Sequence, residues 1–416
     1  MNLAKTAVLT FFSTFIRMLN GFFLNKIIAN FAGPTGIAFI GQFASFVSIV
    51  TSFASGAVNT GVIKYTAEFG DSIDKKAEIW SAAIKIALLC TTPVALIIFF
   101  FSNRFSSFFF KTGEFSIVFE VFGCTLVFFV LNNLILNILN GSMEIRTFTI
   151  INIIQSFVGL FLTGGLTYYF GLKGALLAFA CAQSVVFFAG LKIYVKQSWF
   201  KIANFTKKLD RLALKRLLKF TLMALTTAII GPAVQIFVRD FIAGTLSWDH
   251  VGYWEGLCRI TQTYLMLITT TLNVYYLPKL SSLTSPNEIQ EEILKGYRYV
   301  MPIVIAGGIA IYFFRVPIIK LLFSEKFLPM QDLFFWQLTG EVVKIAAWLI
   351  TNIMLAKAMA KFFILTEIFF SVSYVVLIVC FVPEYGLVGA PIAFTLNFSI
   401  YFGFMLWSLR RFYVLK

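Results

Sequence analysis

The sequence predicts an all-α membrane protein with about twelve transmembrane helices in two six-helix lobes. Hydrophobic residues make up 59% of the 416 residues and charged residues only 13%, whereas soluble proteins carry about 25% charge. Apolar runs of about 20 residues, long enough to cross a bilayer as a helix, recur along the whole chain. These runs lack the two-residue alternation of a transmembrane β-barrel, so helices are the expected spanning elements.

Polar or Gly/Pro-rich breaks separate the runs and define the expected helices. Lys5 precedes the first run, but Arg17 interrupts it and no small-residue cleavage site follows, which indicates an uncleaved span and not a signal peptide. Gly33 and Pro34 end the first span, and polar clusters or further Gly and Pro residues end the others. The expected spans are residues 6–30, 37–60, 77–101, 115–139, 148–170, 175–195, 220–244, 251–277, 299–319, 333–355, 362–382 and 387–409.

The basic residues predict the orientation of these spans. The chain has 34 Lys and Arg residues and a net charge of +15. With a cytoplasmic N-terminus, 22 basic residues fall on the cytoplasmic side, six on the outer side and six within spans. Because cytoplasmic loops collect Lys and Arg, both termini are predicted to be cytoplasmic.

The densest basic stretch connects spans six and seven, with nine Lys and Arg residues between Lys192 and Lys219. Apolar residues recur at helical spacing within it, at Leu209, Leu212, Ala213 and Leu217. This pattern fits an interfacial helix on anionic lipid or, equally, a solvated linker that follows the charge rule. No folded basic surface of the kind that binds nucleic acid is indicated.

An internal repeat relates the two halves of the chain. Residues 170–179 (Phe-Gly-Leu-Lys-Gly-Ala-Leu-Leu-Ala-Phe) match residues 385–394 (Tyr-Gly-Leu-Val-Gly-Ala-Pro-Ile-Ala-Phe) at an offset of 215 residues. The same offset aligns Lys64 with Lys279 and Arg146 with Lys361. We therefore expect an N-lobe at 1–196, a basic cytoplasmic linker at 197–215 and a C-lobe at 216–416.

The repeat also predicts where a substrate would bind. Each half contains an even number of spans, so both halves enter the membrane from the same side and form parallel repeats. Transporters with parallel repeats bind substrate between the halves and expose it to either face in turn. The sequence therefore predicts a transporter with alternating access.

Ionisable residues within spans are costly and mark candidate functional sites. Four cations lie in the leading spans of the two halves, accompanied by polar or acidic side chains at Asn20, Asp240 and Glu255. The four cations are Arg17, Lys26, Arg239 and Arg259. A cavity between the two halves that is lined by these side chains would suit an anionic substrate group. Arg17 and Lys26 lie about 180° apart on an ideal helix, so both face one cavity only if Gly21 bends the helix.

Alternative readings apply to several of these residues. Lys26 and Arg239 lie near the outer interface, where long cationic side chains reach water. Asp240 and Glu255 could serve only to neutralise neighbouring cations. Arg17, near mid-membrane, is the hardest to explain without a cavity.

A second set of charged residues offers candidates for ion coupling. Glu341 and Lys344 are three residues apart in span ten and can pair on one helix. Structural pairing is the favoured interpretation, with proton or cation coupling as the alternative. Glu367 is the third candidate, although it lies within about two turns of the cytoplasmic end of span eleven, where snorkelling to the interface would also explain it.

The sequence contains no pattern typical of an enzyme, a metal site or a cofactor site. The five cysteines lie singly in apolar runs, which fits neither a disulfide framework nor a zinc site. Phosphate-binding glycine loops, nucleophile elbows and metal-binding His/Glu patterns are missing from the sequence. We expect no catalytic residues and no cofactor.

Several segments resemble a known family. They are residues 219–225 (Lys-Phe-Thr-Leu-Met-Ala-Leu), 247–249 (Ser-Trp-Asp), 276–280 (Tyr-Leu-Pro-Lys-Leu), 332–338 (Asp-Leu-Phe-Phe-Trp-Gln-Leu), 356–358 (Ala-Lys-Ala) and 31–34 (Phe-Ala-Gly-Pro). Together with the two-lobe plan, they resemble the Wzx flippases of the multidrug/oligosaccharidyl-lipid/polysaccharide exporter superfamily. Within that group the resemblance is to the branch that moves the enterobacterial common antigen lipid intermediate.

The resemblance implies a flippase of the bacterial inner membrane. It would move an undecaprenyl-pyrophosphate-linked oligosaccharide, an O-antigen or common-antigen unit, to the periplasmic leaflet, with a polysaccharide polymerase and a chain-length regulator as candidate partners. Basic residues on spans one, seven and eight of such flippases are thought to bind the diphosphate. By position they correspond to Arg17, Lys26, Arg239 and Arg259. Asp240 stands where relatives often have a second basic residue, which argues against phosphate binding there.

Two other functions fit parts of this pattern. A multidrug or cation antiporter of the same superfamily would share the fold, although four cavity cations would repel cationic drugs. A scaffold of a polysaccharide assembly complex would transport nothing. For a flippase, transport driven by polymerisation and exchange against protons or cations are both compatible with the sequence.

Overall fold

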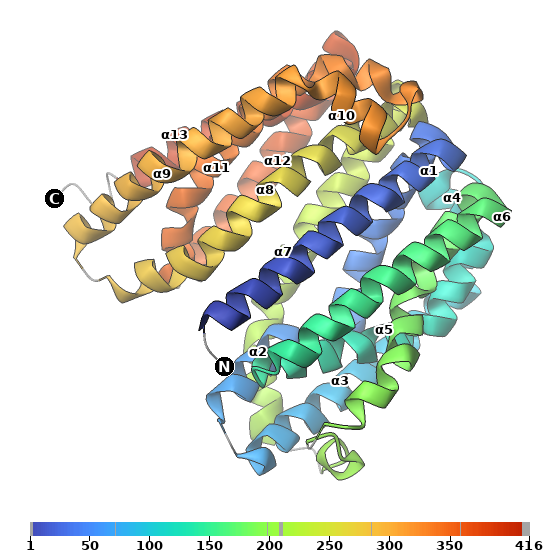
Figure 1. Cartoon of the computed structure of the whole chain (residues 1–416), viewed down its shortest axis with the longest axis vertical. Helices are drawn as coiled ribbons and strands as arrows, with labels where there is room; N and C mark the ends of the chain where they lie inside the picture. The colour runs from blue at the N-terminus through green and yellow to red at the C-terminus, as the bar shows by residue number, and fades with distance from the viewer. Residues whose placement is uncertain are drawn as a thin grey trace. The chain divides into compact units, whose positions relative to one another are not determined.

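The computed structural model is all-helical in the part of the chain that it describes, residues 3–70, 72–197, 199–207, 211–283, 285–357 and 359–409 (Figure 1). The predicted fold class is thereby confirmed. By internal contacts the chain forms two compact units, one of Met1–Ala32 with Phe39–Ala233 and one of Gly33–Ala38 with Val234–Lys416. The predicted lobe and linker boundaries stay a prediction.

The first unit contains the N-terminal helices. They are α1 (Leu3–Ala54), α2 (Asn59–Glu68), α3 (Ile73–Phe100), α4 (Ser102–Phe110), α5 (Ser116–Gly141), α6 (Ile145–Tyr194), η1 (Ile202–Asn204) and the first part of α7 (Arg211–Thr245). Its core includes a cluster of phenylalanine rings formed by Phe43, Phe46, Phe119 and Phe122, in which Phe43 and Phe46 stack and the other contacts are edge-to-face. Rings in such geometry add favourable contacts beyond their buried area.

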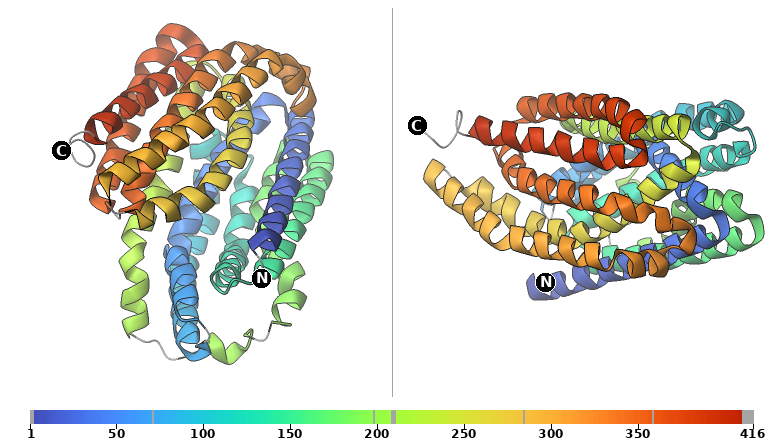
Figure 2. Two further views of the ribbon diagram at one scale, coloured as in Figure 1. Left: turned by 60° about the vertical axis from the view of Figure 1, so that its left-hand side comes forward. Right: turned by 90° about the horizontal axis from the view of Figure 1, so that it is seen from above.

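The second unit contains the rest of α7 and the C-terminal helices. They are α8 (Trp248–Ser282), α9 (Pro286–Phe313), α10 (Arg315–Leu322), η2 (Glu325–Leu333), α11 (Phe334–Ala356), α12 (Ala360–Tyr385), η3 (Gly386–Val388) and α13 (Gly389–Leu409). Helix α11 lies at the centre of this unit and packs against α8, α9, α12 and α13 (Figure 2). Side chains on α11 can therefore reach four neighbouring helices.

Eight helical segments in the described residues are long and apolar enough to cross a membrane. Three of them, Thr14–Ala54, Ile145–Tyr194 and Lys361–Ser408, have 41, 50 and 48 residues, and one crossing needs about 20. Each of these three covers two of the expected spans. The expected span 251–277 lies within α8, which is not among the eight.

Two of the expected loops are single-residue kinks. The predicted breaks at 31–36 and 171–174 lie within continuous helices that change direction at Gly33 (φ 65°, ψ −163°) and Gly171 (φ 55°, ψ −135°). Glycine adopts this left-handed region without the Cβ clash of other residues. One glycine is therefore enough to redirect the chain from one helix to the next.

The internal repeat is visible in the backbone of both units. Gly386, 215 residues after Gly171, has φ 60° and ψ −146°, close to the angles of Gly171. A Cβ on Gly174 would overlap the carbonyl oxygen of Leu166, and a Cβ on Gly389 would overlap that of Phe381. Since both pairs keep the offset of 215, the two glycines make the same close helix approach in each half.

The segment after α6 packs on the first unit. Trp199 and Phe205 contact the ring of Trp80 on α3, and the Lys207 ammonium lies 2.7 Å from the Asp74 carboxylate. At the start of α7, Ala213 and Leu217 are 2% and 0% exposed within a core cluster. The interfacial-helix interpretation is wrong for these two residues, because protein covers them; Leu209 lies outside the described residues.

Candidate functional site

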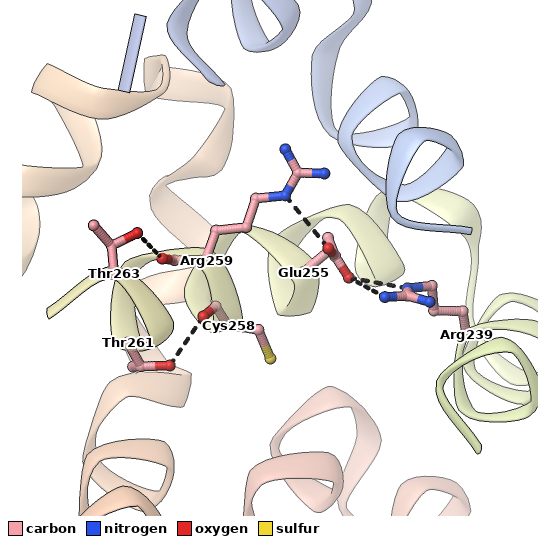
Figure 3. A network of polar contacts seen from close by, with 6 residues as sticks. All are labelled: Arg239, Glu255, Cys258, Arg259, Thr261 and Thr263. Carbon is pink, nitrogen blue, oxygen red and sulfur yellow. Dashed lines mark hydrogen bonds and ion pairs between the residues drawn. The ribbon is translucent and has the colours of Figure 1, made fainter. Parts of the chain in front are cut away.

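Helices α7 and α8 bring two of the candidate cations to one carboxylate (Figure 3). The Arg239 guanidinium donates from Nε (2.9 Å) and Nη2 (2.8 Å) to Oε2 of Glu255. One turn along α8, Arg259 donates from Nε to Oε1 of the same carboxylate at 3.3 Å. We call this group the arginine cluster: Arg239, Glu255 and Arg259.

Burial and charge distinguish the two arginines. Arg239 is 6% exposed and Glu255 8% exposed, so the short pair between them is shielded from water. The Arg259 side chain is 20% exposed, and its terminal nitrogens point away from Glu255 (Figure 3). The two guanidinium groups share one carboxylate. Arg259, the more exposed of the two arginines, is the member placed to contact an anion.

A second network connects α8 with α11. Glu341 is 2% exposed, and its carboxylate accepts hydrogen bonds from Thr261 (3.2 Å), Gln337 (3.1 Å) and Lys344 (3.1 Å). The expected pairing of Glu341 with Lys344 is therefore present. The Lys344 ammonium also lies 5.6 and 5.8 Å from ring centroids on α13, those of Phe394 and Phe398.

Sequence reasoning missed two members of this network. Gln337 lies four residues before Glu341, on the same face of α11, and this spacing could have indicated it. Thr261 is on another helix, 80 residues away in the chain, and carries no sequence signal. A polar network between helices depends on their packing.

The candidates on α1 belong to the first unit. Arg17 is exposed, Lys26 is half-buried, and the buried Oδ1 of Asn20 accepts no hydrogen bond from the described residues. The only residue with non-helical backbone angles within α1 is Gly33, so Gly21 keeps helical angles. On a regular helix the nine residues between Arg17 and Lys26 turn their side chains about 180° apart, and their role in a shared site stays a prediction.

Two further candidates lie on α7 and α12. Asp240 follows Arg239 on α7 and is half-buried. Glu367 on α12 is half-buried, and no described residue donates a hydrogen bond to its carboxylate. Among the described residues, no group of three or more His, Cys, Asp and Glu side chains could hold a metal ion.

The sequence matches a known family and named relatives. The profile of the polysaccharide biosynthesis protein family matches residues 27–332. The chain is 29% identical over 420 residues to the lipid III flippase of Escherichia coli (strain K12), which covers 99% of this chain and 100% of the relative. The lipid III flippase of Shigella flexneri matches with the same identity and coverage.

Solved structures share the fold. An inward-facing multidrug resistance transporter of the MATE family, in the MOP superfamily, aligns with a TM-score of 0.77 at 16% identity and covers 96% of this chain and 94% of its own. The lipid II flippase MurJ in an inward closed conformation aligns with a TM-score of 0.74 at 17% identity, over 98% of this chain and 87% of its own. At sequence identities of 16% and 17%, these structural similarities show the fold alone.

Proposed function

Because this chain belongs to the polysaccharide biosynthesis protein family, we propose that it is a flippase for an undecaprenyl-pyrophosphate-linked oligosaccharide. The chain is a multi-pass membrane transporter. In the proposed function it moves its substrate from the cytoplasmic to the periplasmic leaflet of the bacterial inner membrane, for the synthesis of a surface polysaccharide. Two relatives that align over their whole length are named lipid III flippases, which supports this substrate class.

The observation that carries the proposal is the arginine cluster, in which two guanidinium groups share Glu255 and Arg259 stays 20% exposed. Guanidinium groups are strong donors to anions when they are partly shielded from water. A diphosphate supplies negative charge and several acceptor oxygens that match a guanidinium. The same positive charge disfavours the cationic drugs of an antiporter.

The residues of the site take different roles in this mechanism. Arg259 contacts the diphosphate, while Arg239 holds Glu255 and so orients Arg259. Arg17 and Lys26 are proposed as further diphosphate ligands, each in a different conformation of the transport cycle, because they leave α1 on opposite sides. Asn20 and Asp240 contribute polarity beside these cations.

Passage of the substrate follows from its chemistry. The glycan crosses through the polar interior of the protein. The prenyl tail remains in the lipid, because its apolar surface is already surrounded by lipid chains there. Alternating access opens the site to each leaflet in turn. The flipped glycan would be handed to a polysaccharide polymerase with its chain-length regulator.

Ion coupling is proposed for Glu367. Glu341 accepts three hydrogen bonds and pairs with Lys344, so a change in its protonation would break a packed network. Glu367 can gain and lose a proton without breaking any bond to a described residue. We assign Glu341 and Lys344 a structural role and Glu367 the coupling role.

Reconstituted flipping tests the proposed function. Purified protein in liposomes should transfer a fluorescent undecaprenyl-diphosphate oligosaccharide between leaflets, and Arg259→Gln should slow the transfer at least tenfold. The matched control is Arg298→Gln, which removes an exposed arginine of α9 and should leave the rate unchanged. Absence of transfer by the wild-type protein would favour the scaffold alternative, and drug efflux in its place would favour the antiporter.

A further inference from the structure

A pocket between α8 and α11 is not used by the proposed diphosphate site. It has a volume of about 470 Å³, within the range of about 300–1,000 Å³ that is usual for small-molecule sites. All of its lining residues belong to the second unit. We call it the α8–α11 pocket, lined by Gln262, Met266 and Thr269 of α8 and by Lys344, Ile345 and Trp348 of α11.

The walls of this pocket are held in place without a ligand. The Thr261 hydroxyl on α8 donates to Glu341 on α11, and the same carboxylate accepts a bond from Lys344. Thr269 directs its hydroxyl to the carbonyl oxygen of Leu265, one turn back on its own helix, at 3.0 Å. A pocket with bonded walls loses little conformational entropy when it binds a ligand.

The lining combines an aromatic ring with hydrogen-bonding groups. Trp348 is half-buried and offers an amphipathic indole. The amide of Gln262 is exposed and makes no hydrogen bond to a described residue, and it can both donate and accept. Lys344 adds ammonium donors. A sugar ring has apolar C–H faces and hydroxyl edges. The indole ring of Trp348 matches the apolar faces, and the polar groups of Gln262 and Lys344 match the hydroxyls.

The pocket begins about one helical turn along α8 from the proposed diphosphate ligand, Arg259. Gln262, Met266 and Thr269 follow Arg259 by three, seven and ten residues, which places all four on one face of α8. At 1.5 Å per residue, the pocket extends from about 4.5 to 15 Å along the helix from Arg259. A sugar attached to a diphosphate on Arg259 would therefore enter it.

We propose that the α8–α11 pocket is the subsite for the sugar next to the diphosphate, with Trp348 as the stacking platform and Gln262 as a hydrogen-bonding partner. This inference rests on the proposed flippase function and deepens it. It assigns recognition of the glycan to the second unit, separately from recognition of the diphosphate by Arg259.

A comparison of two lipid probes tests the subsite. Binding to the protein in lipid nanodiscs is measured with undecaprenyl diphosphate and with undecaprenyl diphosphate that carries one N-acetylglucosamine. We expect the wild-type protein to bind the sugar-bearing lipid about tenfold more tightly. Gln262→Ala and Trp348→Ala should each remove most of this preference and leave the affinity for the bare diphosphate lipid unchanged.

Matched controls and folding checks keep the result interpretable. Gln290→Ala on α9 and Trp407→Ala on α13 remove the same residue types at exposed positions and should retain the full preference. Trp348→Ala also removes packing, so Gln262→Ala, at an exposed position, and Thr269→Val serve as variants that leave the fold intact.

The outcomes separate this inference from the proposed function. A preference that persists in the variants of Gln262 and Trp348, or an equal loss of affinity for both lipids, would overturn the subsite. Equal binding of both lipids by the wild type would also overturn it while leaving the flippase proposal standing. If the wild type bound neither lipid, the proposed function itself would fail.

Discussion

Glu255 is a single carboxylate that accepts hydrogen bonds from two guanidinium groups, those of Arg239 and Arg259. Both oxygens are used, and the residue is 8% exposed. In such a site the two charges of a pair have lost water, and their mutual attraction offsets that loss only while both are present. The stability of the region therefore depends on this carboxylate.

Replacement of Glu255 by Gln should destabilise the protein strongly. The amide keeps the shape but not the charge, and it leaves two arginines without their carboxylate. Loss of one member of a buried ion pair typically costs about 3–5 kcal/mol. Thermal unfolding of the detergent-solubilised protein should show a clear fall in Tm.

A solvent-exposed pair provides the control. Glu291 forms an i, i+4 pair with Lys295 at 2.8 Å, and both side chains are largely exposed. Glu291→Gln should leave Tm nearly unchanged, because water replaces the lost partner. Equal Tm values for the two variants would contradict the importance given to Glu255.

Arg17 is the residue-scale test of the diphosphate site in cells. Arg17→Ala should abolish surface glycan while membrane levels of the protein stay normal, and Arg17→Lys should retain part of the display because the charge remains. The measurement is immunoblotting of surface polysaccharide alongside the protein itself. Full display by the alanine variant would remove Arg17 from the site.

At the scale of elements, residues 33–38 of α1, where the helix turns at the Gly33 kink, are attached to the start of α8. We call these residues the turn. Thr35 donates from its backbone N–H (3.2 Å) and its hydroxyl (2.6 Å) to Oδ1 of Asp249. The backbone of Pro34 lies so close to Gly252 that an ideal Cβ there would overlap the Pro34 carbonyl. Residue 252 must be glycine for this turn to reach α8.

Gly252→Ala should therefore separate the turn from α8. Overpacking of a tight contact typically costs about 1–3 kcal/mol, although alanine favours a helix over glycine by about 1 kcal/mol. The net effect should be a lower Tm and slower flipping. Proteoliposome flipping and thermal unfolding measure the two effects.

The matched control is Gly244→Ala near the end of α7. No atom lies within 4 Å of an ideal Cβ on Gly244, so the substitution should be neutral or slightly stabilising. If both glycine variants behaved alike, close approach of the turn would not matter for the protein.

At the scale of the whole molecule, the distribution of basic residues predicts the topology. An alkaline phosphatase domain fused after Thr112, in the segment between α4 and α5, should be active because that segment is expected outside. The same domain fused after Gln197, in the basic stretch, should be inactive, because phosphatase folds only in the periplasm. Phosphatase activity is measured in colonies that express each fusion. Activity of the Gln197 fusion without activity of the Thr112 fusion would show that the predicted orientation is the wrong way round.

Sequence reasoning located the helices more precisely than the site. Period, length and breaks placed most of every expected span on a helix, because a lipid solvent leaves few alternatives for an apolar run. The expected span 37–60 runs past the end of α1 at Ala54, and the expected span 299–319 crosses the break between α9 and α10. The sequence also paired Glu341 with Lys344, since three residues on one helix are close by construction. Sequence reasoning did not predict the hydrogen bond of Thr261 to Glu341 or the ion pair of Arg239 with Glu255, since these contacts join separate helices.

What the sequence by itself determined is the class, the helical spans, the repeat and the set of charges that need an explanation. Each follows from local rules, such as apolar length, glycine position and the cost of charge in lipid. Only the tertiary structure decided how these charges differ. The structure buries Arg239 against Glu255, leaves Arg259 the more exposed of the two arginines and joins Thr261 to Glu341, because side-chain neighbours depend on how helices pack and not on their sequence order.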